Sequence, residues 1–348
     1  MRPAPAPGHS GHQTGPAAVP DRVHSGAAAL IPGRNLVKRG RGLRIWLFCL
    51  GALLLAFLGG QTNPVVFLLT GVLVPLPVLL VGWRVGPRAA LFLALTTALA
   101  IFSLKPGLEI IKAHLGFGEM LLMGVLLSGF HARGMAPARA IVLTVVALSL
   151  LALVYLAGEA ALLKLSPQEL LAQKTREIME MVKQFLEGGG SSTMPFGGTA
   201  AELEALVQGL LPGLVVANMG LVAWFNVVLV RQIAFALDRP QPDTQPLYHW
   251  AAPEWLIFVA LGAGFLLLAP VKVLRFFSLN LLIILGLLYF CQGMAVVSAW
   301  FHRFSLPRIF RLVGYLLLFI NPMMFLVIIL GMMDLWFDFR RLHQPEEA

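Results

Sequence analysis

Polar side chains inside long apolar runs are the residues of this chain whose types could support binding chemistry. Asn218, Gln292 and Asn321 each fall near the middle of such a run, and Tyr289 lies one helical turn before Gln292. An amide in the hydrocarbon core of a membrane is costly unless it has a partner. Three amides at similar depth could therefore converge with Tyr289 on one small-solute site. The alternative is that they form hydrogen bonds between helices.

Pro322, which directly follows Asn321, predicts a break in the last apolar run. A proline lacks the backbone N–H and leaves a carbonyl of the preceding turn without its helical partner. Helices that are interrupted near the bilayer midplane are a common way to build a solute site. We therefore expect a discontinuous helix around Asn321.

The motifs of the common enzyme and cofactor classes are missing from the sequence. It has no His-Glu-x-x-His pair, nucleophile elbow or Cys-x-x-Cys, and the glycine-rich run 188–198 lacks the Lys-Ser/Thr ending of a phosphate loop. The two cysteines, Cys49 and Cys291, lie in apolar runs and are expected to be buried thiols. We expect no enzymatic activity, no metal, no cofactor and no nucleic-acid partner.

The elements that carry these residues are predicted to be transmembrane helices. Of the 348 residues, 58% are hydrophobic and 12% are charged, whereas about a quarter are charged in soluble domains. A spanning helix needs about 20 mostly apolar residues. Nine runs qualify or come close: 44–60, 64–83, 87–104, 116–131, 140–158, 210–230, 254–271, 278–300 and 310–333. The predicted fold is an all-α polytopic bundle of about nine spans, or eight if one short segment is re-entrant.

The distribution of lysine and arginine predicts the orientation of the bundle. With the N-terminus inside, sixteen of the 26 basic residues face the cytoplasm and ten face outward. The net charge of +9 is then an orientation signal rather than a sign of nucleic-acid binding. We expect a multi-pass protein of the bacterial cytoplasmic (inner) membrane, with a cytoplasmic N-terminus and the lipid bilayer as its first partner.

Composition divides the chain into five segments. They are a disordered basic tail (1–42), an N-terminal bundle of about five helices (43–158), a polar insertion (159–209), a C-terminal bundle of about four helices (210–333) and an interfacial tail (334–348). In the insertion, Ser166 and Glu169 form a capping box that opens an amphipathic helix, and a glycine-rich linker follows it. That helix is expected to be a lid or a partner-docking element, or to lie on the membrane surface or the bundle.

Small residues recur at four-residue spacing in two predicted spans, which lets helices approach closely. Packing within the bundle and docking of a partner membrane protein are both compatible with this spacing. The residues are Ala52, Ala56 and Gly60 in the first span, and Ala90, Ala94 and Ala98 in the third.

The segment 334–340, Asp-Leu-Trp-Phe-Asp-Phe-Arg, is the most distinctive in the chain. Trp336 is a natural anchor at the membrane interface. Asp334 and Asp338 lie one helical turn apart, with arginines at 340 and 341, so we expect a salt-bridged helix end at the membrane surface.

Together with Pro253-Glu254-Trp255-Leu256, Asn280-Leu281-Leu282, the stretch 289–293 and Leu306-Pro307-Arg308, this ending resembles the YybS-like family of bacterial membrane proteins, a domain of unknown function. The resemblance covers about 45–341 and marks Glu254, Trp255, Asp334, Trp336, Asp338 and Arg340 as motif residues. That family is in turn distantly similar to the substrate-binding components of energy-coupling-factor vitamin transporters. This similarity implies that a membrane coupling subunit docks on the stripe Ala52, Ala56 and Gly60.

Two functions follow from these observations. The first is a small-solute-binding or transport component without its own ATPase, which would hold an unidentified ligand near the midplane amides. The alternative is a non-catalytic membrane scaffold or interaction protein. A transporter should have a polar cavity that reaches one surface, whereas in a scaffold the amides should bond to one another or to the backbone.

Overall fold

The computed structural model describes residues 32–61, 64–104, 108–188, 200–237, 250–320 and 322–340. All regular structure in these ranges is helical, with no strand, which confirms the predicted all-α class. The chain forms two units, Met1–Arg41 and Gly42–Ala348. Most of the predicted N-terminal tail and of the glycine-rich linker lies outside the described residues, although the first helix begins at Pro32, inside the segment predicted as tail.

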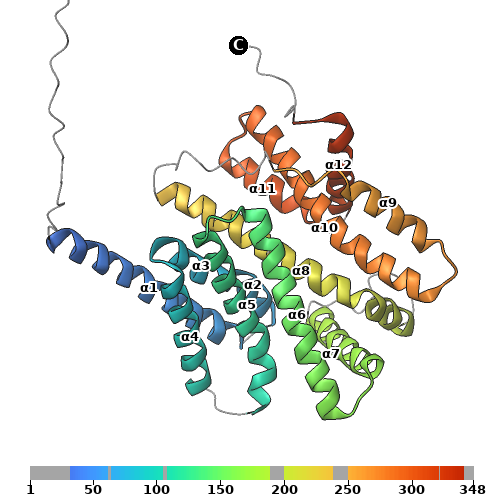
Figure 1. Cartoon of the computed structure of the whole chain (residues 1–348), viewed down its shortest axis with the longest axis horizontal. Coiled ribbons are helices and arrows are strands. Elements are labelled where there is room, and N and C mark those ends of the chain that lie inside the picture. The colour runs from blue at the N-terminus through green and yellow to red at the C-terminus, as the bar shows by residue number, and fades with distance from the viewer. Residues whose placement is uncertain are drawn as a thin grey trace, which may run out of the picture. The chain divides into compact units, whose positions relative to one another are not determined.

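Figure 1 shows the helices of the described residues in chain order. They are α1 (Pro32–Gly60), α2 (Pro64–Leu73), α3 (Pro75–Arg84), α4 (Pro87–Leu104), α5 (Leu108–Ala132), α6 (Pro137–Leu163), α7 (Pro167–Gly188), α8 (Ala200–Leu237), α9 (Leu256–Leu267), α10 (Lys272–Arg303), α11 (Arg308–Leu318) and α12 (Met323–Phe337).

Four helical segments of the described chain are long and apolar enough to cross a membrane: Gly42–Gly60, Pro137–Leu163, Leu203–Ala234 and Lys272–Arg303. The pair α11 and α12, bent by 96° around Pro322, would make a fifth, and this interruption confirms the break predicted there. Four shorter apolar helices accompany them: Thr70–Arg84, Pro87–Ser103, Gly116–Ala132 and Leu256–Leu267. The protein is therefore a multi-pass membrane protein, but the predicted count of nine spans is not confirmed, because several segments are shorter than about 20 residues.

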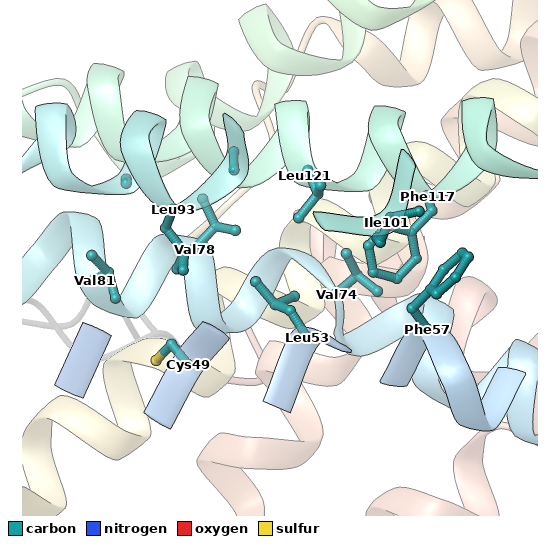
Figure 2. Close-up of a cluster of buried hydrophobic side chains, with 12 residues drawn as sticks. Cys49, Leu53, Phe57, Val74, Val78, Val81, Leu93, Ile101, Phe117 and Leu121 are labelled. Atoms are coloured by element: carbon teal, nitrogen blue, oxygen red, sulfur yellow. The ribbon is translucent and has the colours of Figure 1, made fainter. Parts of the chain in front are cut away.

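The helices of the N-terminal half pack around apolar side chains of α1, α3, α4 and α5. Figure 2 shows this cluster, in which Cys49, Leu53 and Phe57 of α1 are buried. Phe57 meets Phe117 of α5 edge to face at a centroid distance of 5.5 Å. Of the small-residue stripes, Ala90 and Ala94 are buried and Ala98 is exposed, while Ala52, Ala56 and Gly60 are half-buried. On α4 the small residues thus serve at least partly for packing within the bundle.

The amphipathic helix α7 packs on α6 and α8. Its start is the predicted capping box: the Ser166 N–H donates to Glu169 Oε2 (2.7 Å), and the Glu169 N–H donates to Ser166 Oγ (3.3 Å). These hydrogen bonds lower the pKa of Glu169. Leu170, Thr175 and Met179 form the buried face, and Lys174 forms an ion pair with Glu159 of α6 at 3.0 Å. The insertion helix is therefore a docked part of the bundle.

In the C-terminal half, α10 is the central helix and contacts α8, α9 and α12. Two glycines permit its close approach to α12. A Cβ on Gly293 would collide with the carbonyl of Val327, and a Cβ on Gly331 would collide with the carbonyl of Tyr289. Small residues at a crossing let two helix backbones come close enough for this contact.

Candidate functional site

A polar network joins three separate segments of the C-terminal half. It consists of the side chains of Gln292, Asp334 and Arg340 with backbone groups of Trp250 and Ala252. Arg340 donates to Asp334 Oδ2 through Nη2 (2.5 Å) and Nε (2.9 Å), and through Nη1 to the carbonyl of Trp250 (2.6 Å). Gln292 Nε2 donates to the same Asp334 oxygen (3.2 Å), and the Ala252 N–H donates to Gln292 Oε1 (3.2 Å).

Local structure explains how these side chains meet. Asp338 ends α12 in a left-handed conformation (φ 39°), and its N–H donates to the Asp334 carbonyl. The chain then turns back, so that Arg340 lies against Asp334. The close approach of α10 and α12 at Gly293 and Gly331 brings Gln292 within reach of the same carboxylate.

The network is almost fully buried. The side chains of Arg340 and Asp334 are 3% and 2% exposed. Burying an ion pair is costly unless the remaining polar atoms are satisfied. Within the described part of the chain, Asp334 Oδ1 is buried without a hydrogen-bond partner, and so is Tyr289 Oη on α10. Chemically, the carboxylate oxygen could accept one more hydrogen bond, and the tyrosine hydroxyl could donate or accept one.

The remaining motif residues, Glu254, Trp255, Trp336 and Asp338, lie within three residues of a member of the network in the sequence. Trp255 and Trp336 are both 61% exposed, as expected of tryptophans in the interfacial belt of a membrane protein. Glu254 is exposed and Asp338 is half-buried. Trp300 of α10 meets the ring of Phe339 at 6.0 Å. The sequence motifs around 254, 292 and 334–340 therefore meet in space, and Asp334 has Arg340 as its ionic partner.

The proposed convergence of the midplane amides has a different outcome for each residue. Tyr289 and Gln292 are buried on α10, and Gln292 belongs to the polar network. Asn218 is exposed on α8, and among the described residues neither Gln292 nor Tyr289 bonds to it. Asn321 lies outside the described residues. No set of three His, Cys, Asp or Glu side chains in the described ranges is arranged to hold a metal ion.

Two buried amides, Asn226 and Asn280, were not predicted as candidate site residues. Asn226 of α8 donates to the carbonyl of Val72 (2.8 Å), beside the break between α2 and α3, and to that of Val222 (2.7 Å). Asn280 of α10 donates to the carbonyls of Gly209 (2.9 Å) and Phe276 (2.8 Å).

Prolines close to the bonded carbonyls could have signalled both amides. Pro75 begins α3, and Pro212 lies inside α8 between Gly209 and Gly213. A proline interrupts the hydrogen-bond ladder of a helix, so a side-chain donor is needed where the freed carbonyls are buried.

Comparison with known proteins gives a family match that covers most of the bundle. A search of curated proteins and a search of solved structures found no match. The family model described as "Predicted membrane protein (DUF2232)" matches residues 51–335, far more than half of the chain. The matched stretch includes Gln292 and Asp334. The chain therefore belongs to the DUF2232 family of predicted membrane proteins.

Proposed function

We propose that this protein is a non-catalytic scaffold of the bacterial cytoplasmic membrane, with its N-terminus in the cytoplasm. The observation that supports the proposal is that the buried amides form hydrogen bonds within the protein. Asn226 and Asn280 donate to backbone carbonyls of neighbouring helices, and Gln292 engages Ala252 and Asp334. A solute-binding protein keeps such groups available for its ligand, whereas a scaffold uses them to fix its helices.

The docked helix α7 is the element we assign to partner binding. Its buried face is held on α6 and α8, and the opposite side exposes Arg176, Glu177 and Glu180. Because this polar side belongs to a helix that is already folded, a partner would not have to order it on binding.

Purification of the tagged full chain in mild detergent, followed by native mass spectrometry, tests the scaffold. We expect a protein partner at fixed stoichiometry, lost when Arg176, Glu177 and Glu180 are replaced by alanine, and no bound metabolite. Replacement of Lys164, Gln168 and Lys272 by alanine is the control, because these residues are also exposed. A metabolite retained by the wild type and lost in Gln292→Leu would overturn the proposal.

A small-solute-binding or transport component is the second candidate, and the unpartnered Asp334 Oδ1 and Tyr289 Oη favour it. Together with the interrupted α11–α12 pair, these atoms would suit a solute that offers hydrogen-bond donors. On this proposal the YybS-like resemblance and its similarity to energy-coupling-factor components apply. A coupling subunit would then supply energy and dock at Ala52, Ala56 and Gly60.

Tyr289→Phe separates the two candidates, because it removes one hydroxyl and preserves the ring. The transport proposal expects this variant to fold normally and to lose the solute uptake that the wild type shows in proteoliposomes that also hold the coupling subunit. The scaffold proposal expects no uptake by either protein, and an unchanged protein partner.

A further inference from the structure

The bent pair α11 and α12 can follow one of two paths through a membrane. It could be a single span that is broken near its middle, or a hairpin whose two arms open to the same side. We propose that the pair is a re-entrant hairpin, which enters the membrane from the surface at which α10 ends and returns to that surface. On this path α11 and α12 add no crossing of the membrane.

The first arm, α11, runs along α10 in the opposite direction. The ring of Tyr315 meets that of Phe301 at 5.2 Å, close to the end of α10 at Arg303. One turn later, where α11 ends, the ring of Phe319 meets that of Phe290 at 5.3 Å. Phe290 precedes Phe301 by eleven positions, which is about 16 Å along a helix. The first arm therefore leads from the end of α10 toward its middle.

The second arm, α12, returns in the same direction as α10. The contacts in chain order are Ile328 with Gly286, Asp334 with Gln292, and Phe339 with Trp300. Both numbers rise together from one contact to the next, so the two helices are parallel. The last contact, at a ring-centroid distance of 6.0 Å, lies three residues before the end of α10. The chain therefore leaves α12 at the level where α10 ends.

The polar network fastens the returning arm at that level. Arg340 forms its ion pair with Asp334 and also donates to the carbonyl of Trp250, in the segment that leads into α9. Trp255 at the start of α9 and Trp336 near the end of α12 are both exposed, as is typical of side chains at a membrane interface. The start of α9, the end of α10 and the end of α12 thus share one surface.

The break between the arms has local partners for its described N–H groups. The Phe319 and Ile320 N–H groups donate to the carbonyls of Leu316 and Leu317, and the Met324 N–H donates to the carbonyl of Ile320. Irregular backbone at membrane depth needs such partners. With 11 and 15 residues, the arms are about 16 and 22 Å long, so neither crosses the roughly 30 Å of hydrocarbon by itself.

The positions of the arginines favour the same path. Arg303, Arg308 and Arg311 lie in the sequence at the entrance of the hairpin, and Arg340 and Arg341 follow its exit. A spanning pair would place these two groups on opposite sides of the membrane. A hairpin places all five on one side, which agrees with the tendency of arginines near membrane helices to gather on one side.

Cysteine labelling from the two sides of the membrane tests this path in the full chain. K272C and S305C, at exposed positions before and after the span α10, report its two sides, and E346C reports the chain beyond α12. The wild type is the blank, because Cys49 and Cys291 are buried. An impermeant maleimide should label E346C and S305C in the same preparation, spheroplasts or inverted vesicles, and K272C in the other. Labelling of E346C together with K272C would overturn the hairpin.

Spin-label distances decide the case independently of the tail. The matched pairs W336C/S305C and W336C/K272C share the exposed position on α12 and differ in the end of α10 that they probe. For a hairpin we expect about 40 Å between the labels of W336C/K272C, from the rise of α10, and less than about half of that for W336C/S305C. A spanning pair would reverse this order. Equal distances, or a longer distance to S305C, would contradict the proposal.

Discussion

The side-chain amide of Asn280 joins the two backbone groups of α8 that flank Pro212. Its Oδ1 accepts a hydrogen bond from the Gly213 N–H at 2.5 Å, and its Nδ2 donates to the Gly209 carbonyl at 2.9 Å. In a regular helix, these two groups would bond to each other, four residues apart. Asn280 therefore bridges α8 at its proline and ties α10 to it.

Replacing Asn280 with leucine should destabilise the protein, because two backbone groups of α8 lose a buried partner while the side-chain size is nearly kept. We expect a loss of about 1–3 kcal/mol. The measurement is thermal unfolding in detergent. Asn218→Leu is the matched control, since that asparagine is exposed on α8, the helix that Asn280 contacts. If both variants unfold at the wild-type temperature, Asn280 does not hold α8.

The buried pair of Asp334 and Arg340 predicts an asymmetry between single and double variants. Asp334→Leu or Arg340→Met alone should cost about 3–5 kcal/mol, because each leaves an uncompensated buried charge. The double variant should recover most of that loss. Unfolding measured at one pH for all four proteins gives the coupling free energy. Additive losses would show that the two side chains act independently.

The crossing of α10 and α12 predicts that Gly331→Ala is strongly destabilising. The added Cβ would collide with the carbonyl of Tyr289 and lie 2.7 Å from the Gly293 nitrogen, so the helices must separate. Gly286→Ala is the control on α10, because its Cβ would meet only the Ile328 side chain, at 3.9 Å. We expect a lower thermal midpoint for Gly331→Ala and an unchanged or slightly higher one for Gly286→Ala. Equal midpoints for the two variants would contradict the tight crossing.

The features that the sequence predicts correctly are local ones. The capping box at Ser166 and Glu169 depends on residues three apart, and the break at Pro322 depends on one missing N–H. Both are decided within a single helical turn, so no knowledge of the neighbouring helices is needed.

The identity of the buried amides depends instead on how each helix is rotated. Asn218 and Asn226 lie on the same apolar helix, yet Asn226 is buried and Asn218 is exposed. Packing decides between them: Gly220 approaches the Leu287 side chain of α10, and Asn226 reaches the carbonyl of Val72. Hydropathy gives the depth of a residue along a helix but not the side on which it lies, so Asn226 and the contact between Gln292 and Asp334 could not be predicted.

The ion pair between Lys174 and Glu159 makes the docking of α7 dependent on pH. Burial opposes the charge of Lys174, but the hydrogen bond to Glu159 and the charges of Glu177 and Glu159 outweigh it and raise the pKa of Lys174. A raised pKa contributes stability that is fully present below the unfolded value, about 10.4, and is lost as the pH rises through the folded value. The helix should therefore loosen only in strong alkali.

Spin labels at E180C and A205C, both exposed positions, would report the separation of α7 from α8. We expect a narrow distance distribution at pH 8 that broadens above about pH 10.5. Lys174→Met should broaden it already at pH 8. Lys174→Arg should keep it narrow at pH 11, because the guanidinium group stays charged. Lys164→Met is the control at an exposed lysine, and a narrow distribution for Lys174→Met at every pH would show that apolar contacts alone hold α7 in place.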